Sequence, residues 1–155
     1  MLEQLDPASR QLRCSVRAPA LNDFDKMADL AAQLRYPSTG EQIRLRLNSM
    51  RNSEEYAVYV AQLPGGQVAG WIGLRVFRSV EQDGCAEISG LIIDQQVRSC
   101  GIGRILLDAA DAWARDQGCH AISVHSNVIR ERAHQFYARN GYNHVKTQKY
   151  LVKHL

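Results

Sequence analysis

The stretch GLIIDQQVRSCGIGRILL, residues 90–107, decides the fold. It reads as an apolar strand, a short loop and an amphipathic helix that starts near Gly101. The first amide groups of a helix lack partners inside the helix, and the helix dipole adds partial positive charge there. Glycine at 101 and 103 removes side chains that would block an approaching anion. The stretch therefore predicts a loop that binds a diphosphate.

Two common nucleotide-binding motifs do not match this loop. A Walker A loop needs a Lys followed by Ser or Thr, and neither is present. A Rossmann fingerprint needs a third glycine, where Leu106 stands, and an acidic residue after the next strand, where Ser126 and Asn127 stand. What remains is a [Q/R]-x-x-G-x-[G/A] pattern, to which Arg98 and Arg104 can add charge-assisted contacts.

The rest of the chain adds further strands and helices on both sides of this stretch. Local signals include Asn22 as an N-cap, a capping box of Thr39 with Gln42, and a hairpin turn at residues 64–67. Together these signals predict strands at 12–18, 56–63, 68–77, 85–94 and 120–126, helices at 23–34, 41–50, 101–116 and 129–140, and one or two short closing strands within 142–155. Hairpins first and a strand-helix-strand crossover later indicate a mixed α/β (α+β) sheet.

Two segments resemble signatures of the GNAT superfamily of N-acetyltransferases. Residues 98–103, RSCGIG, match its pyrophosphate motif, and residues 133–142, AHQFYARNGY, look like its Phe-Tyr helix end. The order of elements is also similar over the whole chain. The resemblance implies a GNAT fold: a central, mostly antiparallel sheet of six to seven strands flanked by four helices, with a V-shaped splay between strands four and five. Ser99 departs from the glycine that the family often has there, and Cys100 is unusual.

The resemblance also implies acetyl-CoA as co-substrate and the residues that hold it. The pyrophosphate would lie on Arg98, Ser99, Cys100, Gly101, Ile102, Gly103 and Arg104, and the pantetheine arm on the backbone of Leu91, Ile92 and Ile93. Asn127 matches a position whose amide contacts the pantetheine, although it reads equally well as an N-cap of the next helix. The histidines give no metal site, since His120 and His125 lie on opposite faces of a strand and no HExxH is present.

Acetyl transfer needs a neutral amine, yet only about one part in a thousand of a lysine-like amine is neutral at pH 7. A nearby base would help. The resemblance suggests Glu87 for this role, and strand alternation places Glu87, Ser89, Leu91 and Ile93 on one face if no bulge intervenes. The alternative is a solvated Glu that pairs with a neighbouring strand.

Tyr137 is the candidate general acid. The family places this tyrosine beside the CoA sulfur, where its hydroxyl can protonate the departing thiolate. On spacing alone, Phe136 and Tyr137 join Ile129 and Ala133 on one helical stripe, which reads equally well as core.

Length and composition narrow the class of protein. The 155 residues suit one domain, and the net charge of +3 has no basic block that would indicate nucleic acid. No apolar run reaches the roughly 20 residues that cross a bilayer, and residues 1–9 do not resemble a signal peptide. The four cysteines lie far apart and read as free thiols, which indicates the reducing cytoplasm: Cys14, Cys85, Cys100 and Cys119. We also expect no membrane partner. A homodimer stays open.

The acceptor is less constrained than the donor. In this fold it usually meets the cofactor near residues 35–42, 71–77 and 143–150, a region without a clear acidic cluster. Three hypotheses remain: a small-molecule amine acetyltransferase of the aminoglycoside-modifying kind, a protein Lys or N-terminal acetyltransferase, and a non-catalytic acyl-CoA-binding module. Glu87 and Tyr137 argue against the third, because a pure binder needs neither.

Overall fold

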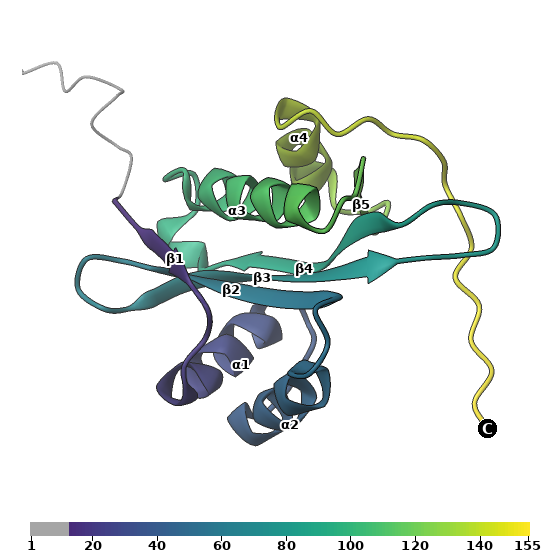
Figure 1. Ribbon diagram of the computed structural model, residues 1–155. Coiled ribbons are helices and arrows are strands. Elements are labelled where there is room, and N and C mark those ends of the chain that lie inside the picture. The colour runs from purple at the N-terminus through teal and green to yellow at the C-terminus, as the bar shows by residue number, and fades with distance from the viewer. Residues whose placement is uncertain (1–12) are drawn as a thin grey trace, which may run out of the picture. The chain divides into compact units, whose positions relative to one another are not determined.

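The computed structural model describes residues 13–155, which fall into two compact units that meet in sequence between Val124 and His125. The larger unit holds one five-stranded sheet with helices on both faces (Figure 1). Its strands are β1 Ser15–Arg17, β2 Tyr56–Gln62, β3 Val68–Phe77, β4 Cys85–Ile93 and β5 Ile122–Val124. Its helices are the 3₁₀ turn η2 Leu21–Asp23, α1 Phe24–Gln33, α2 Gly40–Met50, the 3₁₀ turn η3 Gln95–Val97 and α3 Ile102–Asp116. The smaller unit contains α4 Glu131–Arg139.

The sheet has the strand order β1-β2-β3-β4-β5. The first four strands pair antiparallel. β5 pairs parallel to β4, because α3 carries the chain back to the level at which β4 begins. The expected mixed, mostly antiparallel sheet with four helices is confirmed. The expected count of six to seven strands is wrong, since the described residues form five.

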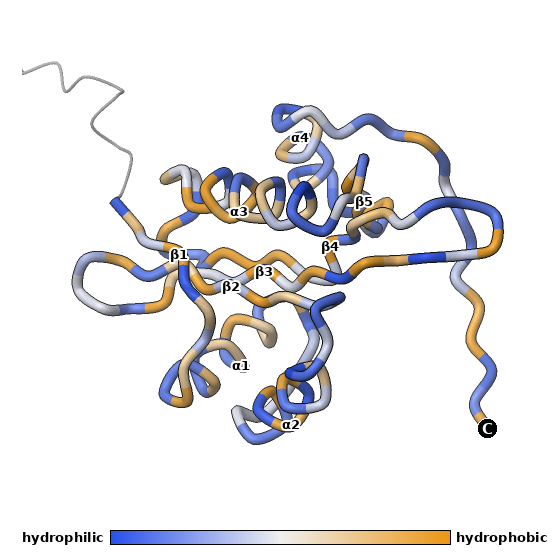
Figure 2. The backbone as a smooth tube through the Cα atoms, viewed as in Figure 1, coloured by the Kyte–Doolittle hydropathy of each residue, from blue (hydrophilic) through white to orange (hydrophobic). Residues whose placement is uncertain are grey.

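The two faces of the sheet have separate cores. Helices α1 and α2 cover one face and α3 covers the other (Figure 1). Met27 and Leu30 of α1 pack with Val60 and Ile92 on the first face, where the indole Nε1 of Trp71 donates to the Met27 carbonyl at 3.2 Å. On the α3 side the largest buried side chains are Ile72, Leu74, Ile102 and Leu106. The burial of each such side chain contributes about 1.5–3 kcal/mol to the stability of the fold. Figure 2 shows β3, which lies between the two cores, mostly in the colour of apolar residues.

Local sequence signals set several element ends. Thr39 and Gln42 form the expected capping box, with the Gln42 amide donating to Thr39 Oγ1 at 3.1 Å and the Thr39 amide donating to Gln42 Oε1 at 2.9 Å. The hairpin turn at 64–67 is confirmed, with Gly66 at a φ of 89°. Asn22 as the N-cap of the first helix is wrong, because residues 21–23 form η2 and α1 is capped at Asp23.

The end of the chain differs from expectation. Residues 143–155 form no strand with any described residue, and Val145, Tyr150 and Leu155 are exposed. The segment contains strand-forming residues such as Val145, Tyr150 and Val152, but a strand also needs a neighbour that accepts its hydrogen bonds. Leu12, where the first strand was expected to begin, lies outside the described residues. No helix in residues 13–155 has the length and apolar character needed to span a bilayer.

Candidate functional site

The second half of β4 has a neighbour on only one side. Pairing with β3 continues to Ile93, whereas pairing with β5 stops at the Ile88–Val124 pair. Beyond Ile88, no strand of the described chain pairs with the other edge of β4. This is the edge that the expected splay requires.

Backbone groups of two predicted residues point toward this edge. The Asp94 amide donates to the Ala69 carbonyl at 2.8 Å, so its polar groups face β3. Because the direction alternates along an antiparallel strand, Ile92 also faces β3, while the N–H and C=O groups of Leu91 and Ile93 face away from it. Arg98 Nε donates to the Ile93 carbonyl at 3.4 Å, as this orientation requires. Ile92 is instead a core residue, with only 4% of its surface exposed.

A β-bulge changes the faces of β4. Gly73 pairs with Gly90 and Leu74 with Ile88, which leaves Ser89 without a partner in β3. The bulge reverses the alternation beyond Ser89. Glu87 therefore lies on the face covered by α1 and α2, and Leu91 and Ile93 lie on the opposite face. The prediction that Glu87 shares a face with Leu91 and Ile93 required a strand without a bulge, and it is wrong.

Glu87 is buried, and its carboxylate forms an ion pair with a neighbouring strand. Arg75, directly opposite in β3, contacts Glu87 Oε1 through Nη2 at 2.8 Å and through Nε at 3.2 Å. A buried carboxylate is costly unless a charge partner and hydrogen bonds compensate it, and Arg75 provides both. Glu87 lies one residue before Ile88, where pairing with β5 ends.

Sequence reasoning missed Arg75. The alternation of β3 shows that Arg75 lies on one face with Trp71, but not which residue of β4 it meets. That pairing depends on the register of the hairpin, which the polar loop at residues 78–84 does not specify.

The loop before α3 turns through two residues in the left-handed conformation. Ser99 has a φ of 63° and Gly101 a φ of 83°, and Gly101 caps α3 without any side-chain cap bond. The first amide bonded inside the helix is that of Ile105, which donates to the Gly101 carbonyl at 3.2 Å. Within residues 13–155 the amides of Ile102 and Gly103 have no acceptor. The fold therefore leaves both donors unused, at the buried Ile102 and at the half-buried Gly103.

The other residues of the loop differ in their availability. Arg98 is half-buried and directed at the Ile93 carbonyl. Arg104 is exposed, and its Nε donates to Asp108 Oδ1 at 2.9 Å along the helix. The thiol of Cys100 contacts the Arg98 carbonyl at 3.6 Å. Of the two arginines, Arg98 is therefore the one whose side chain is held against the strand and loop, whereas Arg104 is held along the helix.

Asn127 and Tyr137 belong to the smaller unit. The Asn127 side-chain oxygen accepts a hydrogen bond from the Ile129 amide at 3.1 Å, which is an Asx turn before α4 rather than its N-cap, since Arg130 caps that helix. The ring of Tyr137 packs edge-on against Phe136 and Tyr142, each at a centroid distance of 5.3 Å. Burial raises the pKa of Tyr137 to about 12, and the charge of Arg130 opposes this shift.

Comparisons with known proteins bear on the family and the fold of the chain. A family model described as "Acetyltransferase (GNAT) family" matches residues 24–142. An aminoglycoside N(6')-acetyltransferase type 1 of Stenotrophomonas maltophilia is 28% identical over 80% of this chain and 86% of its own. An aminoalkylphosphonate N-acetyltransferase of Salmonella typhimurium is 33% identical over 60% of this chain and 62% of its own. An aminoglycoside 6'-N-acetyltransferase from Acinetobacter baumannii has the same fold, with a TM-score of 0.80 at 13% identity over 92% of this chain and 99% of its own.

Proposed function

Because the chain belongs to the acetyltransferase (GNAT) family and is an acetyl-CoA-dependent N-acetyltransferase, we propose that it acetylates the primary amine of a small molecule. The amine attacks directly while donor and acceptor are bound together. Its nitrogen forms a bond to the acetyl carbon as the carbon–sulfur bond breaks. One proton leaves the nitrogen and the CoA sulfur gains one.

The geometry of residues 89–103 supports the donor half of this proposal. The acceptor-free amides of Ile102 and Gly103 suit the pyrophosphate, with Arg98 beside them. The outward N–H and C=O groups of Leu91 and Ile93 suit the amides of the pantetheine arm, which pair as another strand would. Asn127 is the proposed side-chain contact to that arm. When bound, acetyl-CoA supplies an activated thioester carbonyl.

Glu87 and Tyr137 are the proposed proton acceptor and donor. Glu87 receives the amine proton, directly or through water. Tyr137 delivers a proton to the thiolate, and its hydroxyl is protonated at neutral pH, as an acid must be before transfer. Two of the related proteins are named for small amine acceptors, and this favours a small molecule over a protein as substrate.

The observation that carries this proposal is the pair of acceptor-free amides at Ile102 and Gly103. Acetyl-CoA at about 100 times its Kd should stabilise the protein by about 2.7 kcal/mol, which raises Tm by roughly 5–10 °C. Gly103→Val should remove this shift, because its side chain blocks the amides while the helical backbone accepts it. An unshifted wild-type Tm at saturating acetyl-CoA contradicts the proposal, as does a normal shift in the variant.

The role of Tyr137 has a separate test. Tyr137→Phe keeps the ring packing against Tyr142 and removes only the proton donor. We expect kcat to fall at least about tenfold, a minimum set below the roughly 10²–10⁴-fold that general acid catalysis typically contributes, with little change in the Kd for acetyl-CoA. An unchanged kcat with the preferred amine would return Tyr137 to a packing role.

A further inference from the structure

A polar row crosses the sheet on the face covered by α1 and α2. The strand register places Tyr56 of β2 opposite Arg75, Arg75 opposite Glu87, and Glu87 opposite Ser123 of β5. Residues directly opposite one another share a face, so the four side chains form one line. Trp71 lies on the same face, and its ring lies over Gly90, where an added Cβ would be 3.2 Å from the indole.

This row is exposed at Tyr56 and Arg75, buried at Glu87 and half-buried at Ser123. The side chain of Arg75 is 45% exposed and that of Glu87 is 10% exposed. Tyr56 is also exposed. The buried member is Glu87, next to the point where the pairing of β4 with β5 ends, and the exposed end of the row leads away from it along Arg75. A molecule that reaches Glu87 over this face therefore passes the guanidinium.

Arg75 has hydrogen-bonding capacity that the fold does not use. Its Nε and Nη2 both donate to Glu87 Oε1. Its Nη1 makes no hydrogen bond to any residue of the described chain. An arginine with a free N–H face, fixed in direction by a buried partner, is a binding group for a carboxylate, phosphate or phosphonate.

Two of the carboxylates at the row are already paired with arginines. Glu87 is held by Arg75, and Glu55, next to Tyr56, is paired with Arg78 at 3.1 Å. A polyamine or aminoglycoside would need spare carboxylates at this surface to compensate its several charges. An anionic group instead finds a directed, unused donor.

We propose that the acceptor is an amine that also carries an anionic group, and that Arg75 binds this group and determines specificity. The proposal rests on the proposed function, because it places the amine at Glu87. One short molecule then contacts both members of the ion pair: its amine meets the carboxylate of Glu87 and its anion meets the Nη1 side of Arg75. The two charged groups are therefore joined by a short chain.

The test uses three amines of equal chain length: aminopropylphosphonate, propylamine and diaminopropane. Release of the CoA thiol gives kcat/KM for each. The measured quantity is the ratio of kcat/KM for the phosphonate to kcat/KM for propylamine, because any effect that Arg75 has through Glu87 alters both terms alike. We expect wild type to prefer the phosphonate, and Arg75→Gln to lower the ratio at least about tenfold, as the loss of a charge-assisted contact implies.

Two further variants control for charge. Arg78→Gln removes the same charge three residues away, outside the row, and should leave the ratio within about twofold of wild type. Arg75→Lys keeps the charge but loses the paired donors, and should give an intermediate ratio. Each variant must keep the Tm increase with acetyl-CoA, which shows that the fold and the donor site are intact.

Each remaining outcome decides the proposal. Preference for diaminopropane, or a ratio that Arg75→Gln leaves unchanged, overturns the anion site while amine acetylation stands. If no amine is acetylated although acetyl-CoA binds, the proposed function fails. Calorimetry with aminopropylphosphonate then tests Arg75 by itself: binding that Arg75→Gln abolishes supports the anion site, and binding that the variant retains, or its absence in wild type, overturns it.

Discussion

Ser99 holds a left-handed backbone conformation, with φ at 63°, which costs an L-residue roughly 1–2 kcal/mol. The turn at Ser99 precedes Gly101, which is also left-handed and is the N-cap of α3. We expect Ser99→Gly to raise the free energy of unfolding by up to about 1 kcal/mol, because relief of strain exceeds the entropy gained by the unfolded chain. Thermal or urea unfolding of the protein without acetyl-CoA measures it.

Arg35 provides the comparison for this prediction. It is the other described non-glycine residue with a positive φ, at 64°, and it lies just past the end of α1, where glycine is favoured. Arg35→Gly should therefore also stabilise. If Arg35→Gly raises Tm and Ser99→Gly lowers it, the Ser99 side chain makes contacts worth more than the strain, and the prediction for Ser99 is wrong.

At the scale of the element, what the sequence could predict depended on whether the determinant was local. The capping box of α2 and the bounds of β3 follow from residues close to them in the sequence, and both predictions are confirmed. The bulge at Ser89 and the Arg75–Glu87 pair depend on the register of two strands, which no single segment contains. The prediction of closing strands was wrong for the same reason, since 143–155 contains strand-forming residues but has no pairing partner among the described residues.

The start of α2 gives a test at this scale. Thr39→Ala removes the side-chain acceptor for the Gln42 amide and should destabilise the protein by about 1 kcal/mol, or roughly 2–4 °C in Tm. Thr39→Ser keeps the oxygen and serves as the control. Equal losses in the two variants would mean that the threonine methyl group, rather than the cap, stabilises this end of the helix.

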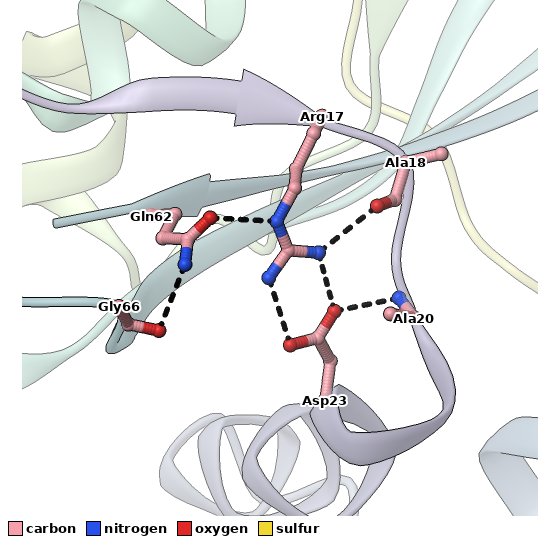
Figure 3. A network of polar contacts seen from close by, with 6 residues as sticks. All are labelled: Arg17, Ala18, Ala20, Asp23, Gln62 and Gly66. Atoms are coloured by element: carbon pink, nitrogen blue, oxygen red, sulfur yellow. Dashed lines mark hydrogen bonds and ion pairs between the residues drawn. The ribbon is translucent and has the colours of Figure 1, made fainter.

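At the scale of the molecule, the network around Arg17 and the ion pair of Lys26 with Asp94 join segments distant in sequence. Arg17 of β1 donates to both oxygens of Asp23, at 2.6 and 3.0 Å, and its Nε reaches Gln62 of β2 at 2.8 Å, which ties the start of α1 to two strands (Figure 3). Lys26 of α1 donates to Asp94, after β4, at 2.7 Å. Both carboxylates are buried, so both segments are held by charges that the fold takes out of water.

These two carboxylates determine how stability depends on acid. The hydrogen bond from Arg17 lowers the pKa of Asp23, and the hydrogen bond from Lys26 lowers the pKa of Asp94. A carboxyl whose pKa is lowered by folding adds stability above its unfolded pKa of about 3.9, and loses it as the pH falls through the lower folded pKa. Tm should therefore fall as the pH drops below about 5, because unfolding then takes up protons.

Asp23→Asn isolates one of these contributions. It should cost about 1–3 kcal/mol at pH 7, where the carboxylate is charged, and the difference from wild type should shrink as the pH approaches the folded pKa of Asp23, because wild type then loses the same interaction. Asp83→Asn, in the exposed loop between β3 and β4, makes the same change in charge without these contacts. Thermal melts from pH 7 to pH 3 measure all three proteins. A difference between Asp23→Asn and wild type that stays constant over this range would show that hydrogen-bond geometry, rather than the charge of Asp23, holds β1 to α1.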